Sequence, residues 1–189
     1  MIQYSGSPFS PSRQIWWAQM GNTYHLWLAP TGKAYDALMK TITDLSKAYH
    51  APVFEPHVTL LGFLPGTEED ISVRSVQLGR SLPPFDILLT EPAFGNQYFQ
   101  CVFLNAQETP AIMNAHERAR SLFLKDPSLY KPHLSLLYGN YSIDVKEKIT
   151  STLTQALSFN FTVDTIHLIR SESEHPKDWT SILTAPLSG

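Results

Sequence analysis

The 189-residue sequence has little cysteine and no excess of positive charge. Its single cysteine, Cys101, excludes an internal disulfide and any metal or iron–sulfur site built from several cysteines. Lys and Arg number 14 against 17 Asp and Glu, and the net charge of −3 argues against a broad basic face for long nucleic acid. We therefore expect no stable nucleic-acid complex, while a small phosphorylated ligand would need only a few well-placed donors.

Long apolar runs are also missing. No run approaches the roughly 18 residues that span a bilayer, so no membrane association is predicted. The first residues contain neither an apolar core nor a small-residue cleavage site, so no signal peptide is predicted. We expect residues 1–20 to form an irregular N-terminal extension, residues 21–189 to form one domain, and the protein to be a cytoplasmic monomer.

The remaining composition, with 43% hydrophobic and 16% charged residues, is typical of a globular protein. Hydrophobic periodicity and turn signals predict the secondary structure. Strands are expected over 23–30, 55–61, 85–90, 97–106, 131–137, 159–169 and 178–185, and helices over 31–50, 68–80, 110–123 and 142–157. Thr67 and Thr109 are the expected N-caps of the second and third helices.

The order of these elements repeats. The heptad EPHVTLL at 55–61 returns as KPHLSLL at 131–137, and each copy lies in a series of helix, short loop, motif strand, helix and strand. The repeat predicts an α+β fold of two lobes with mixed or antiparallel sheets, related by a pseudo-twofold axis.

Alternation along a strand places the chemistry of both heptads on one face. His57 and Thr59 share a face, as do His133 and Ser135, while the aliphatic residues between them point to the bracketing helices. A single histidine beside a hydroxyl is more often a hydrogen-bonded core residue. Two copies at matching places in two half-domains favour a shared functional cleft.

Two imidazoles and two hydroxyls suit phosphoryl chemistry. A histidine pKa near 6.5 allows one imidazole to be neutral and the other protonated, which supplies a general base and a general acid. Hydroxyl groups can donate to phosphoryl oxygens as charge develops there. Displacement at phosphorus then needs no metal and no cofactor.

Three segments carry a family resemblance: YHLWLAP at 24–30, FEPHVTLLG at 54–62 and KPHLSLLYG at 131–139. The paired motifs resemble the HxTx and HxSx signatures of the two-histidine (2H) phosphoesterase superfamily, and within it the small cyclic phosphodiesterases known from plants and yeast. The resemblance covers about residues 23–186. It implies a bilobal fold with antiparallel sheets, flanking helices and a central cleft.

The resemblance also implies an activity. The expected substrate is a small cyclic phosphate, either a nucleoside 2′,3′-cyclic phosphate or ADP-ribose 1″,2″-cyclic phosphate. It implies that His57 and His133 are the acid/base pair, and that Thr59 and Ser135 hold the non-bridging oxygens. Following the usual proposal for the family, we expect His133 to activate water and His57 to protonate the leaving ribose oxygen.

Aromatic and charged neighbours complete the expected site. The resemblance places Trp27 and Tyr138 along the substrate pocket, with Phe63 as a candidate flank on the other side, although a buried core position is an equal alternative for Trp27. If Glu55 and Lys131 lie near the imidazoles, Glu55 would favour a protonated His57 and Lys131 a neutral His133.

Three other functions compete with this interpretation. A 2′-5′ RNA ligase or RNA 2′,3′-cyclic 3′-phosphodiesterase of the same superfamily would need a basic path for polynucleotide. A non-catalytic nucleotide-binding module is disfavoured by the intact histidines and hydroxyls. A zinc hydrolase is disfavoured because the seven histidines show no HExxH pattern or other close ligand spacing.

Overall fold

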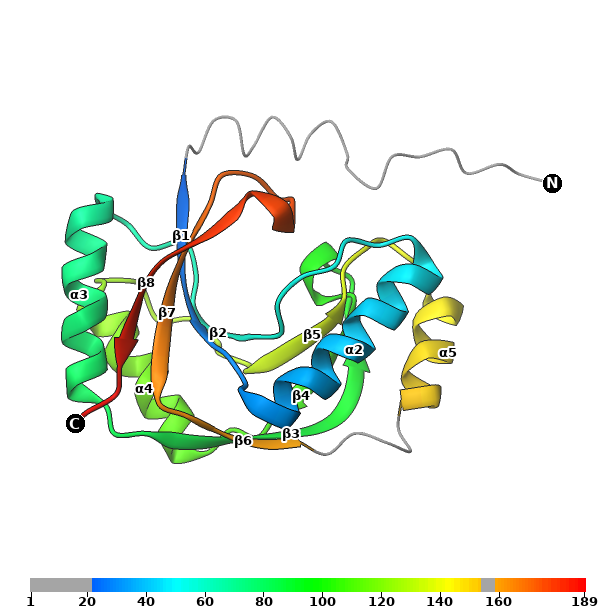
Figure 1. Ribbon diagram of the computed structural model, residues 1–189, viewed down its shortest axis with the longest axis horizontal. Helices are drawn as coiled ribbons and strands as arrows, with labels where there is room; N and C mark the ends of the chain where they lie inside the picture. Colours follow the sequence, from blue (N-terminus) through cyan, green and yellow to red (C-terminus); the bar gives the residue numbers. More distant parts are fainter. Residues whose placement is uncertain (1–21, 154–158) are drawn as a thin grey trace.

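The computed structural model describes residues 22–153 and 159–189 (Figure 1). The extension expected at 1–20 and the last residues of the helix expected at 142–157 lie outside these ranges. The strands are β1 (Thr23–Leu28), β2 (Val58–Leu61), β3 (Phe85–Phe94), β4 (Val102–Ala106), β5 (His133–Leu137), β6 (Phe159–Val163), β7 (Thr165–Ser171) and β8 (Trp179–Pro186). The helices are α2 (Gly32–Tyr49), α3 (Glu68–Ser81), α4 (Pro110–Leu122) and α5 (Ile143–Leu153), with 3₁₀ turns at Tyr98–Gln100 and Pro176–Asp178.

The strands form a curled antiparallel sheet in the order β6-β3-β4-β5-β2-β1-β7-β8. The motif strands β2 and β5 are neighbours at its centre, and they pair only at Val58 and Leu134. This narrow junction divides the sheet into two four-stranded halves. The predicted α+β fold with two pseudo-symmetric lobes is thus confirmed.

Helices cover the two half-sheets in an exchanged arrangement (Figure 1). Helix α4 packs on β2 and α2 packs on β5, while α3 lies on β7 and β8 and α5 on β3 and β4. The expectation that the helices bracketing each motif strand would cover it therefore needs correction. Each motif strand is covered by a helix from the other half of the sequence, because the chain crosses between lobes after β1 and after β4.

The first residues of helices α3 and α4 follow from the sequence. Thr67 accepts a hydrogen bond from the backbone N–H of Asp70, and Thr109 accepts one from the N–H of Ile112. These side chains satisfy donors that have no partner within the helix, and Pro110 begins α4 where no donor is needed. Both predicted N-caps are confirmed.

The duplication extends to the register of the strands. Trp27 lies opposite Thr59 and Phe103 lies opposite Ser135, and in both pairs of strands the register shifts at the preceding residue. Each residue of the second pair follows its counterpart by 76 positions, the spacing that separates the two motif histidines. An irregularity of this kind re-aims side chains beside a site, and here it occurs in both halves.

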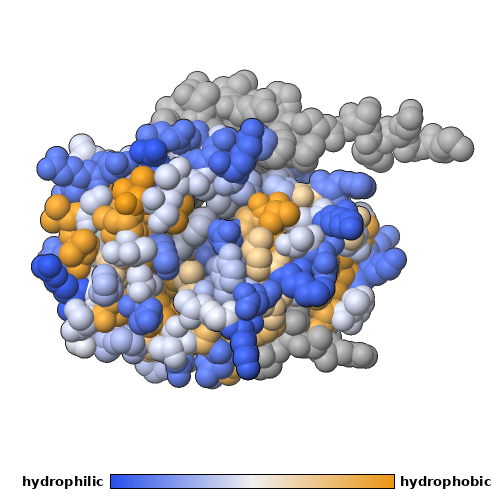
Figure 2. Space-filling model, in the orientation of Figure 1, coloured by the Kyte–Doolittle hydropathy of each residue, from blue (hydrophilic) through white to orange (hydrophobic). Residues whose placement is uncertain are grey.

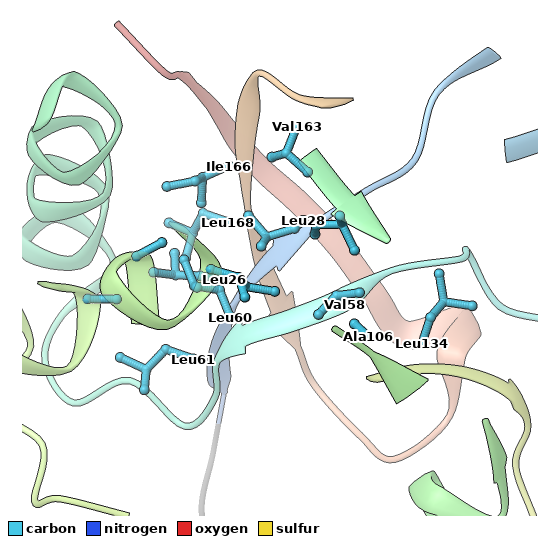
Figure 3. Packing of buried hydrophobic residues seen from close by; sticks show 14 of the residues in the cluster. Leu26, Leu28, Val58, Leu60, Leu61, Ala106, Leu134, Val163, Ile166 and Leu168 are labelled. Carbon is cyan, nitrogen blue, oxygen red and sulfur yellow. The ribbon is translucent and has the colours of Figure 1, made fainter. Parts of the chain in front are cut away.

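The aliphatic face of the motif strands forms the core. Val58, Leu60, Leu134 and Leu136 are fully buried, and Figure 3 shows Val58 and Leu60 among buried neighbours from β1 and β7. Burial of a leucine or valine side chain contributes about 1.5–3 kcal/mol. This face sets the orientation of the strands, so the histidines and hydroxyls point the other way.

Two predicted strands differ most from the observed ones. The strand expected at 97–106 begins only at Val102, because Tyr98–Gln100 form a 3₁₀ turn closed by a backbone hydrogen bond from Gln100 N to Gln97 O. The strand expected at 159–169 divides at Asp164, because β6 pairs with β3 and β7 pairs with β1 in the opposite half-sheet.

No helix within the described ranges is long and apolar enough to cross a membrane. The face shown in Figure 2 is a mixture of hydrophilic residues and separate apolar groups.

Candidate active site

A cavity of about 270 Å³ lies where the two half-sheets meet, and it brings the motif residues together. His57 and Thr59 line it from the first half, and His133 and Ser135 from the second. Trp27 and Tyr138 line it as well. All six residues expected at the site therefore border one space.

His57 is held between a carbonyl group and an indole. Its Nδ1 lies 2.7 Å from the backbone oxygen of Glu55, and its ring stacks on Trp27 with centroids 3.5 Å apart and planes 8° apart. A carbonyl oxygen can only accept, so Nδ1 carries the proton of the neutral ring and Nε2 is left as an acceptor. The backbone thus selects the tautomer in which Nε2 can take up a proton.

His133 has the same anchor and different neighbours. Its Nδ1 lies 2.9 Å from the backbone oxygen of Lys131, and Phe103 meets the ring edge-on with centroids 5.1 Å apart. The amide nitrogen of Gln100 lies 3.2 Å from Nε2 and 3.5 Å from Nδ1. Gln100 was missed from the sequence, since it lies in a segment expected to be a regular strand.

The two hydroxyl residues differ in their hydrogen bonds. Ser135 Oγ donates to the backbone oxygen of Phe99 at 2.7 Å, and it is hydrogen-bonded to the Tyr138 hydroxyl. At Thr59 the backbone oxygen accepts a hydrogen bond from the Tyr130 hydroxyl at 3.1 Å. The Ser135 hydroxyl must therefore exchange its Phe99 partner for a ligand in order to donate to it.

The two expected pocket aromatics are both buried. Trp27 is 9% exposed and forms cavity wall and core at once, which combines the two alternatives considered for it. Tyr138 is 3% exposed, and its ring stacks on Phe54 with centroids 3.7 Å apart. Tyr138 therefore presents little of its side chain to the cavity.

Burial controls the charge of both imidazoles. It lowers the pKa of His57 to about 3, although the hydrogen bond to the Glu55 carbonyl acts in the opposite direction. Nearby His25 and His133 lower the His57 pKa further. Burial also lowers the pKa of His133, against the effect of the Lys131 carbonyl. Both rings are consequently neutral near pH 7.

The charged residues beside the motifs do not tune the histidines as expected. The Glu55 carboxylate accepts from the Tyr35 hydroxyl at 2.6 Å, and Lys131 Nζ pairs with the Glu108 carboxylate at 2.6 Å. Both side chains are exposed and turned to these partners. Glu55 and Lys131 instead contact their imidazoles through backbone carbonyls, so the expected charge effect is wrong.

Further polar and aromatic residues of the cavity were not among the predicted site residues. His25 and Ser171 line it from β1 and β7, with His25 Nε2 lying 3.0 Å from Ser171 Oγ. Trp179 lines it from the start of β8. His25 lies two positions before Trp27 on the same face of β1, and this alternation was the available signal.

Metal ligands do not gather in the described part of the chain. No group of three or more His, Cys, Asp or Glu side chains there is placed to hold a metal ion.

Comparisons with known proteins agree with this geometry. Similar folds occur in the protein TT0787 of Thermus thermophilus, with a TM-score of 0.63 at 20% identity over 88% of this chain and 98% of that one, and in E. coli LigT, with a TM-score of 0.60 at 16% identity over 89% and 99%. The likeness to these two proteins is one of fold, and in this chain the fold brings a histidine and a hydroxyl residue from each half-sheet to one cavity.

The model of the family described as cyclic phosphodiesterase-like protein matches residues 20–172, and the chain belongs to this family. A cyclic phosphodiesterase of Arabidopsis thaliana is 25% identical over 174 residues, covering 88% of this chain and 96% of the relative. The protein is accordingly a phosphodiesterase, as predicted from the sequence.

Proposed function

We propose that the protein hydrolyses nucleoside 2′,3′-cyclic phosphates to 2′-phosphates, with His57 and His133 as the acid/base pair. The observation that carries the proposal is the matching pair of half-sites. Each imidazole borders one cavity and donates through Nδ1 to the carbonyl two residues before it. Each Nε2 is thereby left as the atom that can accept or donate a proton during the reaction.

The reaction is an in-line displacement at phosphorus. A water oxygen bonds to phosphorus while the bond from phosphorus to O3′ breaks. One Nε2 takes the proton from water, and the other imidazole gives its proton to O3′. Thr59 and Ser135 donate to the non-bridging oxygens, where charge increases in the transition state.

The acid needs a proton, and burial of the imidazoles disfavours it. The negative charge of a bound cyclic phosphate raises the pKa of a nearby imidazole, so substrate binding and protonation support each other. The expected division, with His133 as base and His57 as acid, stays a prediction. The deeper burial of His57, which is 8% exposed, makes its protonation the more costly and favours the reverse division.

The cavity suits a substrate with little charge. Among the described residues that line it, none is Lys, Arg, Asp or Glu. A nucleoside cyclic phosphate carries a single negative charge, whereas ADP-ribose 1″,2″-cyclic phosphate carries a pyrophosphate as well. The uncharged lining therefore favours the nucleoside substrate. It also offers no basic path for RNA.

An activity assay with a cyclic nucleotide, carried out in EDTA to remove free metal ions, tests the proposal. Purified protein should convert adenosine 2′,3′-cyclic phosphate to the 2′-phosphate, and phosphorus NMR monitors this conversion. It should act less well on an RNA oligonucleotide that ends in a 2′,3′-cyclic phosphate. An RNA end preferred over the mononucleotide would instead support the RNA phosphodiesterase alternative, and strict metal dependence would contradict the two-histidine mechanism.

A further inference from the structure

Phe63 occupies an unusual position at one end of the cavity. It follows β2 directly after Gly62, and its side chain lines the cavity while remaining 50% exposed. Its backbone φ is 54°, in the left-handed region. A bulky aromatic residue adopts this conformation only at a cost, and such residues cluster at ligand clamps.

Lys125 holds the strained turn in place. Its Nζ donates to the carbonyl oxygen of Gly62 at 2.8 Å and to that of Phe63 at 3.0 Å. Lys125 lies in the segment after α4, more than 60 positions away in sequence. These contacts use the ammonium group to position the backbone that carries the ring.

His25 supports the ring from β1. The two rings meet edge-on, with centroids 5.0 Å apart and planes at 66°. His25 Nε2 lies 3.1 Å from Thr23 Oγ1 and 3.0 Å from Ser171 Oγ, and those two hydroxyls are 2.8 Å apart. A Cβ at Gly62 would lie 3.1 Å from His25 Nδ1, so glycine leaves room for the imidazole.

The other end of the cavity is built differently. The residue 76 positions after Phe63 is Gly139, which has no side chain to offer. Phe99 and Gln100 instead lie against the second motif there, through Ser135 and His133. The pseudo-twofold axis thus places the phosphate centrally, and the differing ends indicate where the rest of the substrate extends.

We propose that Phe63 is the stacking platform for the nucleobase of the substrate, with His25 and Lys125 as its positioning residues. This inference rests on the proposed cyclic nucleotide activity. Stacking on an aromatic ring tolerates different bases, because every base has a π face. The subsite therefore binds purine and pyrimidine nucleoside cyclic phosphates alike.

The test compares two substrates across matched variants. Adenosine 2′,3′-cyclic phosphate has a base, and 1-O-methylribose 2′,3′-cyclic phosphate does not. Phe63→Leu should raise KM for the nucleotide about 5- to 100-fold and leave the base-free substrate unchanged. Phe63→Trp keeps an aromatic ring, so its KM for the nucleotide should stay near that of the native protein. Leu124→Ala is the control, since Leu124 is also exposed, at 82%, with the same φ of 54°, and it should change neither substrate.

The outcomes separate this inference from the proposed function. An equal loss on both substrates, or no loss on the nucleotide, overturns the nucleobase platform. If the native protein turns over neither substrate, the proposed function fails, and calorimetry with adenosine 2′-phosphate then decides on the platform. Binding at least about fivefold weaker in Phe63→Leu supports it, while equal affinity, or no binding to either protein, overturns it.

Discussion

The half of the cavity built around His57 and the half built around His133 share a backbone and differ in their surroundings. Each imidazole donates to the carbonyl two residues earlier, and each strand pair has the same register shift. Trp27 stacks flat on His57, whereas Phe103 meets His133 edge-on. Backbone geometry therefore makes two similar proton-transfer groups, and the neighbouring side chains make them unequal.

The largest expected effect is the loss of either histidine. His57→Ala and His133→Ala should each lower kcat/KM for a 2′,3′-cyclic nucleotide by about 10³–10⁴-fold, because the reaction loses its acid or its base. His50→Asn is the matched control, since His50 is exposed at the end of α2 in a left-handed conformation that asparagine accepts. Full activity in His133→Ala would contradict the two-histidine mechanism.

The same two variants can reveal which half supplies the acid. In a cyclic substrate with sulfur in place of the bridging O3′, the leaving group is a thiolate that needs no proton. The variant that lacks the general acid should recover activity on this substrate, and the variant that lacks the base should not. Recovery in His57→Ala would support the sequence-based assignment, and recovery in His133→Ala would support the assignment that burial favours.

The hydroxyls should show the next largest effects. Thr59→Ala and Ser135→Ala should each lower kcat by about 10²–10³-fold, as expected for loss of one donor to the transition state. The loss should be smaller for Ser135→Ala, because this hydroxyl must first leave the Phe99 carbonyl. Thr59→Ser, which keeps the hydroxyl, should retain most activity. Equal activity of Thr59→Ala and native protein would exclude a role for this group.

Acid should destabilise the first half more than the second. Burial lowers the pKa of His25 to about 4 and that of His57 to about 3, while the unfolded chain takes up these protons near pH 6.5. Their contribution to stability is complete above pH 6.5 and is lost as pH falls toward 4. For His25 the loss is about 3 kcal/mol as an upper estimate.

Urea unfolding at pH 7 and at pH 4.5 measures this effect. The free energy of unfolding should fall less on acidification in His25→Asn than in the native protein, with His50→Asn behaving like the native protein. An identical fall in all three proteins would show that His25 does not titrate as its burial requires.

The smallest expected effect concerns Tyr138. Tyr138→Phe removes the hydrogen bond to Ser135 and keeps the ring that stacks on Phe54. We expect kcat to fall by up to about tenfold, in line with one neutral hydrogen bond, with KM nearly unchanged. A rise in KM without a change in kcat would instead place Tyr138 in direct contact with the substrate.

The sequence predicted the parts of the site that depend on alternation and repetition. The pairing of His57 with Thr59 and of His133 with Ser135 on one face followed from the period of a strand. The exchange of helices between lobes did not follow, because local periodicity carries no information on which half-sheet a helix will cover. Gln100 was not predicted as a site residue for a related reason, since the turn that contains it depends on tertiary contacts.

The charge effect expected of Glu55 and Lys131 failed on a point of local geometry. Sequence proximity suggested that these side chains would reach the imidazoles. In the structure they turn toward Tyr35 and Glu108, and the backbone carbonyls make the contacts. A side chain two positions away in a strand shares a face only when the alternation is intact, and β2 begins only after the histidine.

A crystal structure with bound nucleoside 2′-phosphate would show whether both half-sites act on one phosphoryl group. We expect the phosphoryl group to lie between the half-sites, within hydrogen-bond distance of Nε2 of His57 and of His133. The Thr59 and Ser135 hydroxyls should donate to its oxygens, with Ser135 released from the Phe99 carbonyl. A phosphoryl group bound outside the cavity, or contacting one imidazole while the other keeps its present neighbours, would contradict it.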